Sequence, residues 1–310
     1  MLACVFILAV YGTLTIVETN GQSDFDWLTW KLVHQKIYSD VSSELIHRHI
    51  WEENYRLVQK HNANANATFT MELNHLADQK QRMHSLTVTL DEPILRFEHH
   101  LNNVPDAWDW RKQGCVGPVQ DQGQMGDNVP IVATECVDSF HCTKTRNLVS
   151  ASVVEMHDCC AKTPIASNHI FQCVHDIGGL CSTGDYPRST GVCKNSTCQA
   201  VATVNGGKQV PTGDETAMKA AVYTTPVFAL VDASHPSFQL YRAGTYIEPR
   251  CSSSMLDHAL QVVGYGSASG VDYWICKNSW GVNWGMQGYI YIARNKGNMC
   301  GIASFTIYPV

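Results

Sequence analysis

The spacing of hydrophobic and polar residues divides the chain into a mainly helical first part and a β-rich last third. Before about residue 80, apolar side chains recur every three or four positions, which predicts two amphipathic helices. Asp40 and Ser42 are N-cap candidates for the second helix, and the polar run HNANANAT at 61–68 ends it. The run FTMELNHLAD at 69–78 predicts a short strand that leads into a turn. The apolar positions behind the two helices are Trp27, Trp30, Leu32, Val33, Leu45, Ile50, Trp51, Leu57 and Val58.

The chain after residue 103 begins with helical runs and continues with strands. The segments 126–142, 151–160 and 168–179 have helical spacing, and Pro130 must lie in the first turn of the first one. The later runs are short, alternating, rich in aromatic or β-branched residues and bounded by glycine, which is typical of strands. Helices followed by an antiparallel sheet predict an α+β fold with two subdomains and a cleft between them. The predicted strands lie at 226–233, 258–268, 272–280 and 288–295.

Composition and charge exclude several classes of function. A chain of 310 residues that is 45% hydrophobic can bury a large core. The net charge of −6 is modest and not grouped in blocks, so neither nucleic acid nor an anionic membrane surface is an expected partner. The first 17 residues are nearly all apolar but short for a spanning helix, and we interpret residues 1–21 as a secretory signal peptide. No other stretch has the composition to cross a membrane.

Cysteine usage changes near residue 103. Residues 22–103 contain no cysteine, whereas twelve of the 13 cysteines lie between Cys115 and Cys300. A secreted route favours disulfides, and the spacing fits no usual zinc motif, so we expect no metal and no other cofactor. The same route makes Asn66 and Asn195, which begin Asn-X-Thr sequons, candidate glycosylation sites. We therefore divide the chain into a signal peptide at 1–21, a helical segment at 22–103 and a main domain at 104–310.

Several motifs, in the same order, resemble the papain-like cysteine peptidases, most closely their cathepsin L branch. VPDAWDWR at 104–111 looks like the mature N-terminus, MLDHALQVVGYG at 255–266 like the histidine segment, and CKNSWGVNWGMQGYIYIARN at 276–295 like the asparagine segment. The resemblance implies a papain-like fold with a helical and a β-barrel-like subdomain, preceded by an inhibitor-type propeptide at 22–103. The residues that match the propeptide motifs are Glu44, Arg48, Trp51, Asn54, Val58, Asn62, Asn74, Leu76 and Asp78.

The resemblance also implies a peptidase site. In this family a thiolate at a helix N-terminus attacks the peptide carbonyl, helped by an imidazole, while a glutamine amide stabilises the oxyanion. His258 matches the imidazole, Asn278 the amide that orients it, and Gln122 the oxyanion glutamine. Trp280 matches the indole that shields the histidine–asparagine hydrogen bond. Two family disulfides are expected, Cys159 with Cys193 and Cys251 with Cys300, although Cys160 competes for the first; the remaining pairing cannot be deduced from sequence.

The chain departs from the family at the nucleophile. Alignment on Gln122 and Gly123 puts Asn128 at the position of the catalytic cysteine, and a carboxamide is no nucleophile. Met125 replaces a helix-entry cysteine whose usual partner segment, with its substrate-binding glycine pair, is also missing. The cleft is altered too, because Val129 replaces a tryptophan and Phe305 stands where a smaller residue floors the specificity pocket. We assign Val129, Leu256, Trp280 and Phe305 to the cleft.

Three functions fit these observations. The first is a secreted or lysosomal cathepsin L-like protein without catalytic activity, which binds a peptide or protein ligand, or its own propeptide, in the cleft. The second is a residual hydrolase in which His258 activates water beside Gln122. The third is a structural protein that self-associates through exchanged cysteines. We favour the first hypothesis because the nucleophile, the glycine clamp and the pocket are changed together.

Overall fold

A computed structural model describes residues 23–80, 88–89, 103–123, 128–160, 165–166, 169–194 and 198–310, with backbone only at 88–89 and 165–166. The predicted signal peptide, Met125, the missing glycine segment and Asn195 therefore fall outside the described residues or at their gaps. Within the described ranges no helix is long and apolar enough to span a bilayer. The chain forms two compact units, one containing residues up to 67 together with 71–80 and the other residues 68–70 together with 81–310.

The first unit is a helix pair, as the periodicity predicted. A helix over residues 23–33 precedes α2, Val41–Asn62. Asp40 is the N-cap of α2 and accepts a hydrogen bond from the Ser43 N–H at 2.8 Å. The core of this unit is aromatic: the Trp27 ring lies 5.4 Å from the rings of both Trp30 and Trp51. These buried indoles hold together a unit that has little aliphatic core of its own.

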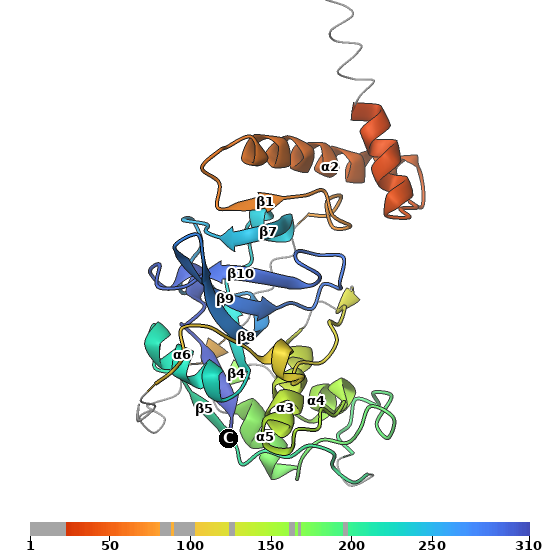
Figure 1. Ribbon diagram of the computed structural model, residues 1–310. Helices are drawn as coiled ribbons and strands as arrows, with labels where there is room; N and C mark the ends of the chain where they lie inside the picture. The colour runs from red at the N-terminus through yellow and green to blue at the C-terminus, as the bar shows by residue number, and fades with distance from the viewer. Residues whose placement is uncertain are drawn as a thin grey trace, which may run out of the picture. The chain divides into compact units, whose positions relative to one another are not determined.

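The first three α-helices described in the second unit begin close to the positions that the sequence predicted, whereas those at 215–224 and 236–239 were not predicted (Figure 1). Pro130 lies in the first turn of α3, the position where a missing N–H costs nothing. Ser152 caps α4 by accepting from the Glu155 N–H at 3.1 Å, and Asp214 caps α6. The helices are α3 (Val129–Thr145), α4 (Val153–Cys159), α5 (His169–Asp176), α6 (Glu215–Thr224) and α7 (Pro236–Gln239), with 3-10 turns at Trp110–Gln113 and Met299–Gly301.

A nine-stranded, mostly antiparallel sheet forms the rest of the second unit. Its strand order is β1-β7-β10-β9-β8-β6-β11-β5, with β3 also paired to β8 and with β10 and β7 parallel. Residues 68–70 belong to this unit, and Thr245 N–H donates to the Thr68 carbonyl at 2.9 Å. A separate pair joins β2 (Val88–Thr89) to β4 (Ile165–Ala166). The strands are β1 (Phe69–Met71), β3 (Trp108–Asp109), β5 (Gly207–Gln209), β6 (Val227–Val231), β7 (Tyr241–Tyr246), β8 (His258–Ala268), β9 (Val271–Lys277), β10 (Tyr289–Ala293) and β11 (Thr306–Pro309).

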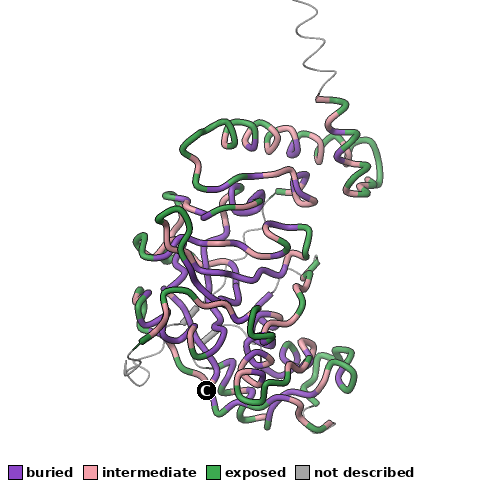
Figure 2. The backbone as a smooth tube through the Cα atoms, in the orientation of Figure 1, coloured by how far each residue is buried: buried purple, intermediate pink, exposed green. Residues whose placement is uncertain are grey.

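The central strands are more deeply buried than alternating runs would be. Every residue of β6 and the first nine residues of β8 are buried, on both faces of the sheet (Figure 2). The reason is that α3 packs against β6 and β8, and α6 packs against β8. Continuous burial of this kind is typical of central strands covered by helices. The predicted α+β class is confirmed, and alternating burial is kept in other strands, such as β10, where Tyr289 and Tyr291 are less buried than Ile290 and Ile292.

Five disulfides link the second unit. Cys159 bonds to Cys193 and Cys251 to Cys300, which are the pairs that the resemblance implied, while Cys160 bonds to Cys173. The other pairs are Cys115–Cys142 and Cys181–Cys198. The thiols of Cys136 and Cys276 are unpaired and buried, and burial raises the pKa of both. These two buried, inert thiols and the ten disulfide-bonded cysteines account for the twelve cysteines between Cys115 and Cys300.

Candidate functional site

The centre of the site is the N-terminus of α3. Asn128 occupies the N-cap position with 3% of its surface exposed, yet its side chain makes no capping bond to the helix. Its Nδ2 donates instead to the carbonyl of Ala259 at 2.7 Å, and its Oδ1 accepts from the Ala259 N–H at 3.2 Å. This two-way pairing copies the hydrogen bonding of a neighbouring strand. The carboxamide therefore ties the start of α3 to the start of β8.

His258, the first residue of β8, lies between two amides. Its Nε2 is 2.7 Å from Asn278 Oδ1, which also accepts from the Ser279 N–H at 2.8 Å. Since that oxygen can only accept, Nε2 carries the proton in this pair. Asn128 Nδ2, at 3.4 Å from Nε2, is then a close neighbour of the imidazole and no second hydrogen bond. The Trp280 ring covers the imidazole with a centroid distance of 4.8 Å.

Ser279 connects these residues to Gln122. Its hydroxyl donates to Gln122 Oε1 at 2.6 Å and accepts from Asn128 Nδ2 at 3.1 Å. The Gln122 N–H also donates to the Ser279 carbonyl at 2.8 Å. Ser279 was not among the predicted site residues, although its place directly after Asn278 was the available signal. We call Gln122, Asn128, His258, Asn278 and Ser279 the entry cluster; all four predicted catalytic positions fall within it.

The chemistry available in the entry cluster is limited. An amide nitrogen has its lone pair delocalised and is not a nucleophile, so Asn128 can bond but cannot attack a carbonyl. Cys136 is two helical turns further along α3, about 12 Å away, and its buried thiol has a raised pKa. An imidazole, an amide donor and a hydroxyl remain. These groups can bind and orient a peptide group, and the imidazole can hold a proton.

A second polar cluster, which the sequence analysis missed, lies further along the same helix. Lys277 Nζ bonds to Glu135 Oε1 at 2.8 Å, and the two side chains are 0% and 6% exposed. Gln261 Nε2 donates to the Glu135 carbonyl and to Ser139 Oγ, both at 2.9 Å. Burial raises the pKa of Glu135, and the Lys277 ammonium opposes that effect. We call these four residues the ion-pair cluster; the signal in the sequence was a single charge inside each of two apolar runs.

Two of the predicted cleft residues do not line an open surface. Val129 is 2% exposed and Phe305 1% exposed, and both belong to the hydrophobic core beneath α3. Phe305 packs edge-on against Phe228, with the ring centroids 6.4 Å apart. Val129 and Phe305 therefore contribute to this core, and their assignment to the cleft stays a prediction. Leu256 packs against the same core while partly exposed, and Trp280 is partly exposed beside the imidazole.

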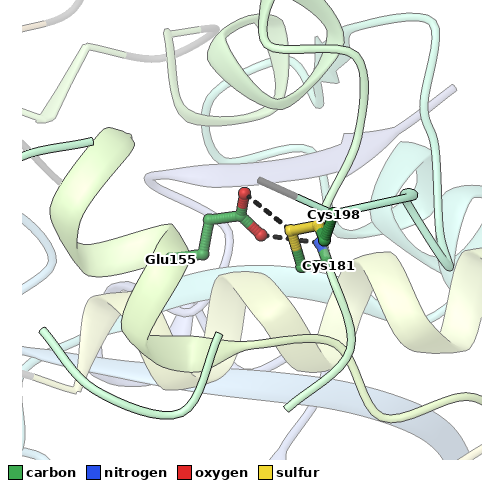
Figure 3. Close-up of side chains that lie close together, drawn as sticks. All are labelled: Glu155, Cys181 and Cys198. Carbon is green, nitrogen blue, oxygen red and sulfur yellow. Dashed lines mark hydrogen bonds between the residues drawn. A yellow bond between two sulfur atoms is a disulfide. The ribbon is translucent and has the colours of Figure 1, made fainter. Parts of the chain in front are cut away.

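Other features of the described residues show no further catalytic site. A surface cavity of about 390 Å³ beside β3 and β8 is lined by Trp108, Arg111 and Tyr265 among others, and by no member of the entry cluster. Two groups have metal-like spacing, Glu155 with Cys181 and Cys198 (Figure 3), and Asp232 with His235 and Cys251. Every cysteine in them is in a disulfide, so neither group offers the thiolate that a metal binds.

Comparisons with known proteins place the chain in a family. The profile described as papain family cysteine protease matches residues 104–310, and the cathepsin propeptide inhibitor domain (I29) matches residues 27–82. The chain is 36% identical to procathepsin L of Rattus norvegicus over 98% of its own length and 97% of the relative's. It is 32% identical to Testin-2 of Rattus norvegicus over the whole of both chains.

Solved structures give the same result. The digestive procathepsin L 3 of Tenebrio molitor larval midgut superposes with a TM-score of 0.80 at 30% identity, covering 93% of this chain and 99% of that one. The recombinant stem bromelain precursor superposes with a TM-score of 0.83 at 27% identity over 93% of this chain and 99% of that one. The predicted papain-like fold and cathepsin L-like resemblance are confirmed. The chain belongs to the papain family of cysteine proteases, as a cathepsin L-like homologue that carries a propeptide domain.

Proposed function

We propose that this protein is a cathepsin L-like homologue that binds peptide or protein ligands and does not hydrolyse them. The observation that supports the proposal is the bonding of Asn128. It stands at the helix entry beside His258, where the family resemblance puts the nucleophile, and its amide is held by Ala259 and Ser279. The cluster keeps the orienting Asn278 and the Gln122 amide, so it retains groups that recognise a peptide carbonyl. A site that recognises a peptide but has no nucleophile would bind the peptide without cleaving it.

The proposal extends to the ligand and the compartment. The cleft ligand would be an extended peptide, from another protein or from the chain's own propeptide at 22–103. The protein would reach the secretory pathway through the signal peptide at 1–21, and act outside the cell or in the lysosomal lumen. Asn66 is exposed and therefore accessible to a glycosyltransferase there. Glycosidase treatment of the secreted protein should increase its gel mobility, and Asn66→Gln should remove part of that change.

Activity measurement tests the proposal directly. Wild type, Asn128→Cys and His258→Ala are expressed as full chains, processed alike and assayed on a peptidyl fluorogenic substrate. We expect wild type to be silent. Turnover by wild type that is lost in His258→Ala would overturn the proposal and support the residual hydrolase, in which His258 activates water.

The Asn128→Cys variant separates two reasons for silence. Activity confined to this variant would support the loss of the nucleophile as the cause. We expect it to be silent too, because the substrate-binding glycine pair of the family is missing from the sequence. Binding is then measured with an unreactive probe, an extended peptide amide without an electrophilic group, immobilised on a sensor surface. Absence of binding by folded wild type would contradict the binding function itself.

A further inference from the structure

The Cys181–Cys198 disulfide has a carboxyl group against one of its two sulfurs (Figure 3). Glu155, on α4, is 0% exposed. Its Oε2 accepts from the Cys181 N–H at 2.6 Å, and its Oε1 lies 3.3 Å from Cys181 Sγ. Both carboxyl oxygens are thus directed at one cysteine. Both contacts are made to Cys181 and not to Cys198, so the two ends of the disulfide differ chemically.

The 3.3 Å contact indicates which form of the carboxyl is favoured. A sulfur in a disulfide has no hydrogen, so the contact is a hydrogen bond only if Glu155 itself carries the proton. Burial raises the pKa of Glu155, and the Cys181 N–H opposes this only in part. The titratable neighbour is Tyr186, whose hydroxyl bonds to Asp158 at 3.1 Å. Neither of these groups brings a positive charge to stabilise the carboxylate.

The two sulfurs also differ in access. Cys181 is 1% exposed, whereas Cys198 is partly exposed and is followed by the exposed Gln199. An external thiolate therefore approaches this disulfide from the Cys198 end. Attack there makes Cys181 the leaving group, which is the sulfur that faces the carboxyl. The more accessible sulfur and the sulfur beside the carboxyl are thus at opposite ends of the same bond, so attack at the first makes the second the leaving group, whose pKa affects the rate of exchange.

We propose that Cys181–Cys198 is a thiol–disulfide exchange site for a small external thiol, with Glu155 as the proton donor to the departing sulfur. The thiolate attacks Cys198 Sγ and forms a mixed disulfide, while the Cys181–Cys198 bond breaks and its electron pair passes to Cys181 Sγ. Glu155 transfers its proton to that sulfur. The product is a Cys181 thiol that donates a hydrogen bond back to the Glu155 carboxylate, so the reduced form keeps the contact. The external thiol is the reductant.

The chain contains an internal reference for this reaction. In the Cys115–Cys142 disulfide both cysteines are buried, at 0% and 2% exposed. The contact recorded for Cys142 Sγ is a backbone carbonyl, that of Gly114 at 3.7 Å, which cannot donate a proton. Both disulfides are exposed to the same thiol reagent in the same sample. The ratio of their two rates therefore cancels the pH dependence of the attacking thiol.

The experiment treats the full chain with reduced glutathione between pH 5 and pH 7.5, quenches with acid, alkylates and maps each cysteine by mass spectrometry. Glutathione should appear on Cys198 and the alkylating label on Cys181. The rate ratio of Cys181–Cys198 to Cys115–Cys142 should exceed about tenfold and should rise as the pH falls, because more Glu155 is then protonated. An adduct on Cys181, or a ratio that does not change with pH, overturns the proposal.

Two variants separate proton donation from general loosening. Glu155→Gln keeps the size and polarity of the side chain but cannot release a proton, and should lower the rate ratio about tenfold. Asp158 lies one turn further along α4. The variant Asp158→Asn weakens the hydrogen bonds to Ser189 and Tyr186 and should leave the rate ratio unchanged. Equal effects of the two variants would overturn the role of Glu155. If Glu155→Gln does not fold, the pH profile of wild type decides alone.

Discussion

The entry cluster and the ion-pair cluster are built from the same three elements and differ in charge and access. α3 contributes Asn128 to one and Glu135 to the other, and the end of β9 contributes Lys277 to one and Asn278, directly after it, to the other. The side chains of the ion-pair cluster are all buried, whereas the entry cluster contains the partly exposed Gln122 and adjoins the partly exposed Trp280. Each leaves one amide atom without a partner among the described residues, Gln261 Oε1 and Asn278 Nδ2. The two clusters therefore do not differ in how completely their polar atoms are hydrogen-bonded.

The difference between the two clusters shows that this fold buries both charged and neutral polar side chains. Formal charges are placed where water cannot reach them, so they fix the position of α3 on the sheet and react with nothing. The neutral groups of the entry cluster are also mostly buried, but one of them, the Gln122 amide, is partly exposed. The two clusters therefore differ in formal charge and in the access of one member to solvent.

Removal of one charge from the ion-pair cluster should have the largest effect. Lys277→Met leaves the Glu135 carboxylate buried without its partner, and we expect the free energy of unfolding to fall by about 3–5 kcal/mol. Urea denaturation followed by tryptophan fluorescence measures it. Adding Glu135→Leu should restore most of the loss, since the unpaired charge is then gone. A single-variant loss under about 1 kcal/mol would mean that water reaches the pair after all.

Truncation in the entry cluster should cost less. Asn128→Ala leaves the N–H and carbonyl of Ala259 without their side-chain partner, and we expect a loss of about 1–3 kcal/mol. Asn147→Ala, at an exposed position after the same helix, is the matched control and should stay within about 0.5 kcal/mol of wild type. The same urea titration compares them. Similar losses in both variants would show that Asn128 does not tie α3 to β8.

The smallest effect is expected from a titrating group on α3 and depends on pH. Burial raises the pKa of Asp138 to about 7, although its carboxylate accepts from the Ala151 N–H at 3.0 Å. Between pH 4 and 7 the folded state binds this proton and the unfolded state does not, so stability falls as the pH rises through that range. Asp138→Asn removes the titration and keeps an acceptor for Ala151.

The variant should therefore gain more stability at pH 8 than at pH 5, by on the order of 1 kcal/mol once the partial exposure of Asp138 is allowed for. Thermal unfolding in parallel buffers at the two pH values measures the difference. Asp185→Asn, an exposed carboxylate elsewhere in the same unit, serves as the control and should show none. If both variants respond alike, the buried position of Asp138 has no special electrostatic cost.

The fold was largely predictable because periodicity and family motifs agreed. Asp40 as an N-cap, Pro130 in the first turn and the strands around His258 and Lys277 follow from local physics, namely capping, the missing proline N–H and β-branched runs. What local patterns could not give is burial. Val129 and Phe305 were assigned to the cleft from their positions in the family motifs, which do not say how deeply each side chain is buried.

The entry cluster was predictable in its members and not in its bonds. Gln122, Asn128, His258 and Asn278 come from the resemblance, but the pairing of Asn128 with Ala259 depends on the register of α3 against β8. Ser279 links Gln122 to Asn128 over more than 150 positions of sequence, a proximity that only the tertiary fold creates. The pairing of Glu135 with Lys277 also depends on the tertiary fold. A charged residue in an apolar run predicts that it has a partner, but the sequence does not show which residue that partner is.

The strand β1 has a consequence for any maturation of this protein. Residues 68–70 complete one edge of the sheet, although they precede residue 103 in the chain, and Gly244 allows the Thr68 carbonyl to approach where a side chain would collide with it. Cleavage that releases 22–103 would withdraw this strand and leave the Thr245 N–H unpaired at a bare edge. Such an edge accepts any extended chain of suitable shape. A processed form would therefore expose an unpaired edge strand when it loses its first segment. Its tendency to associate would then depend on which chain pairs with that edge.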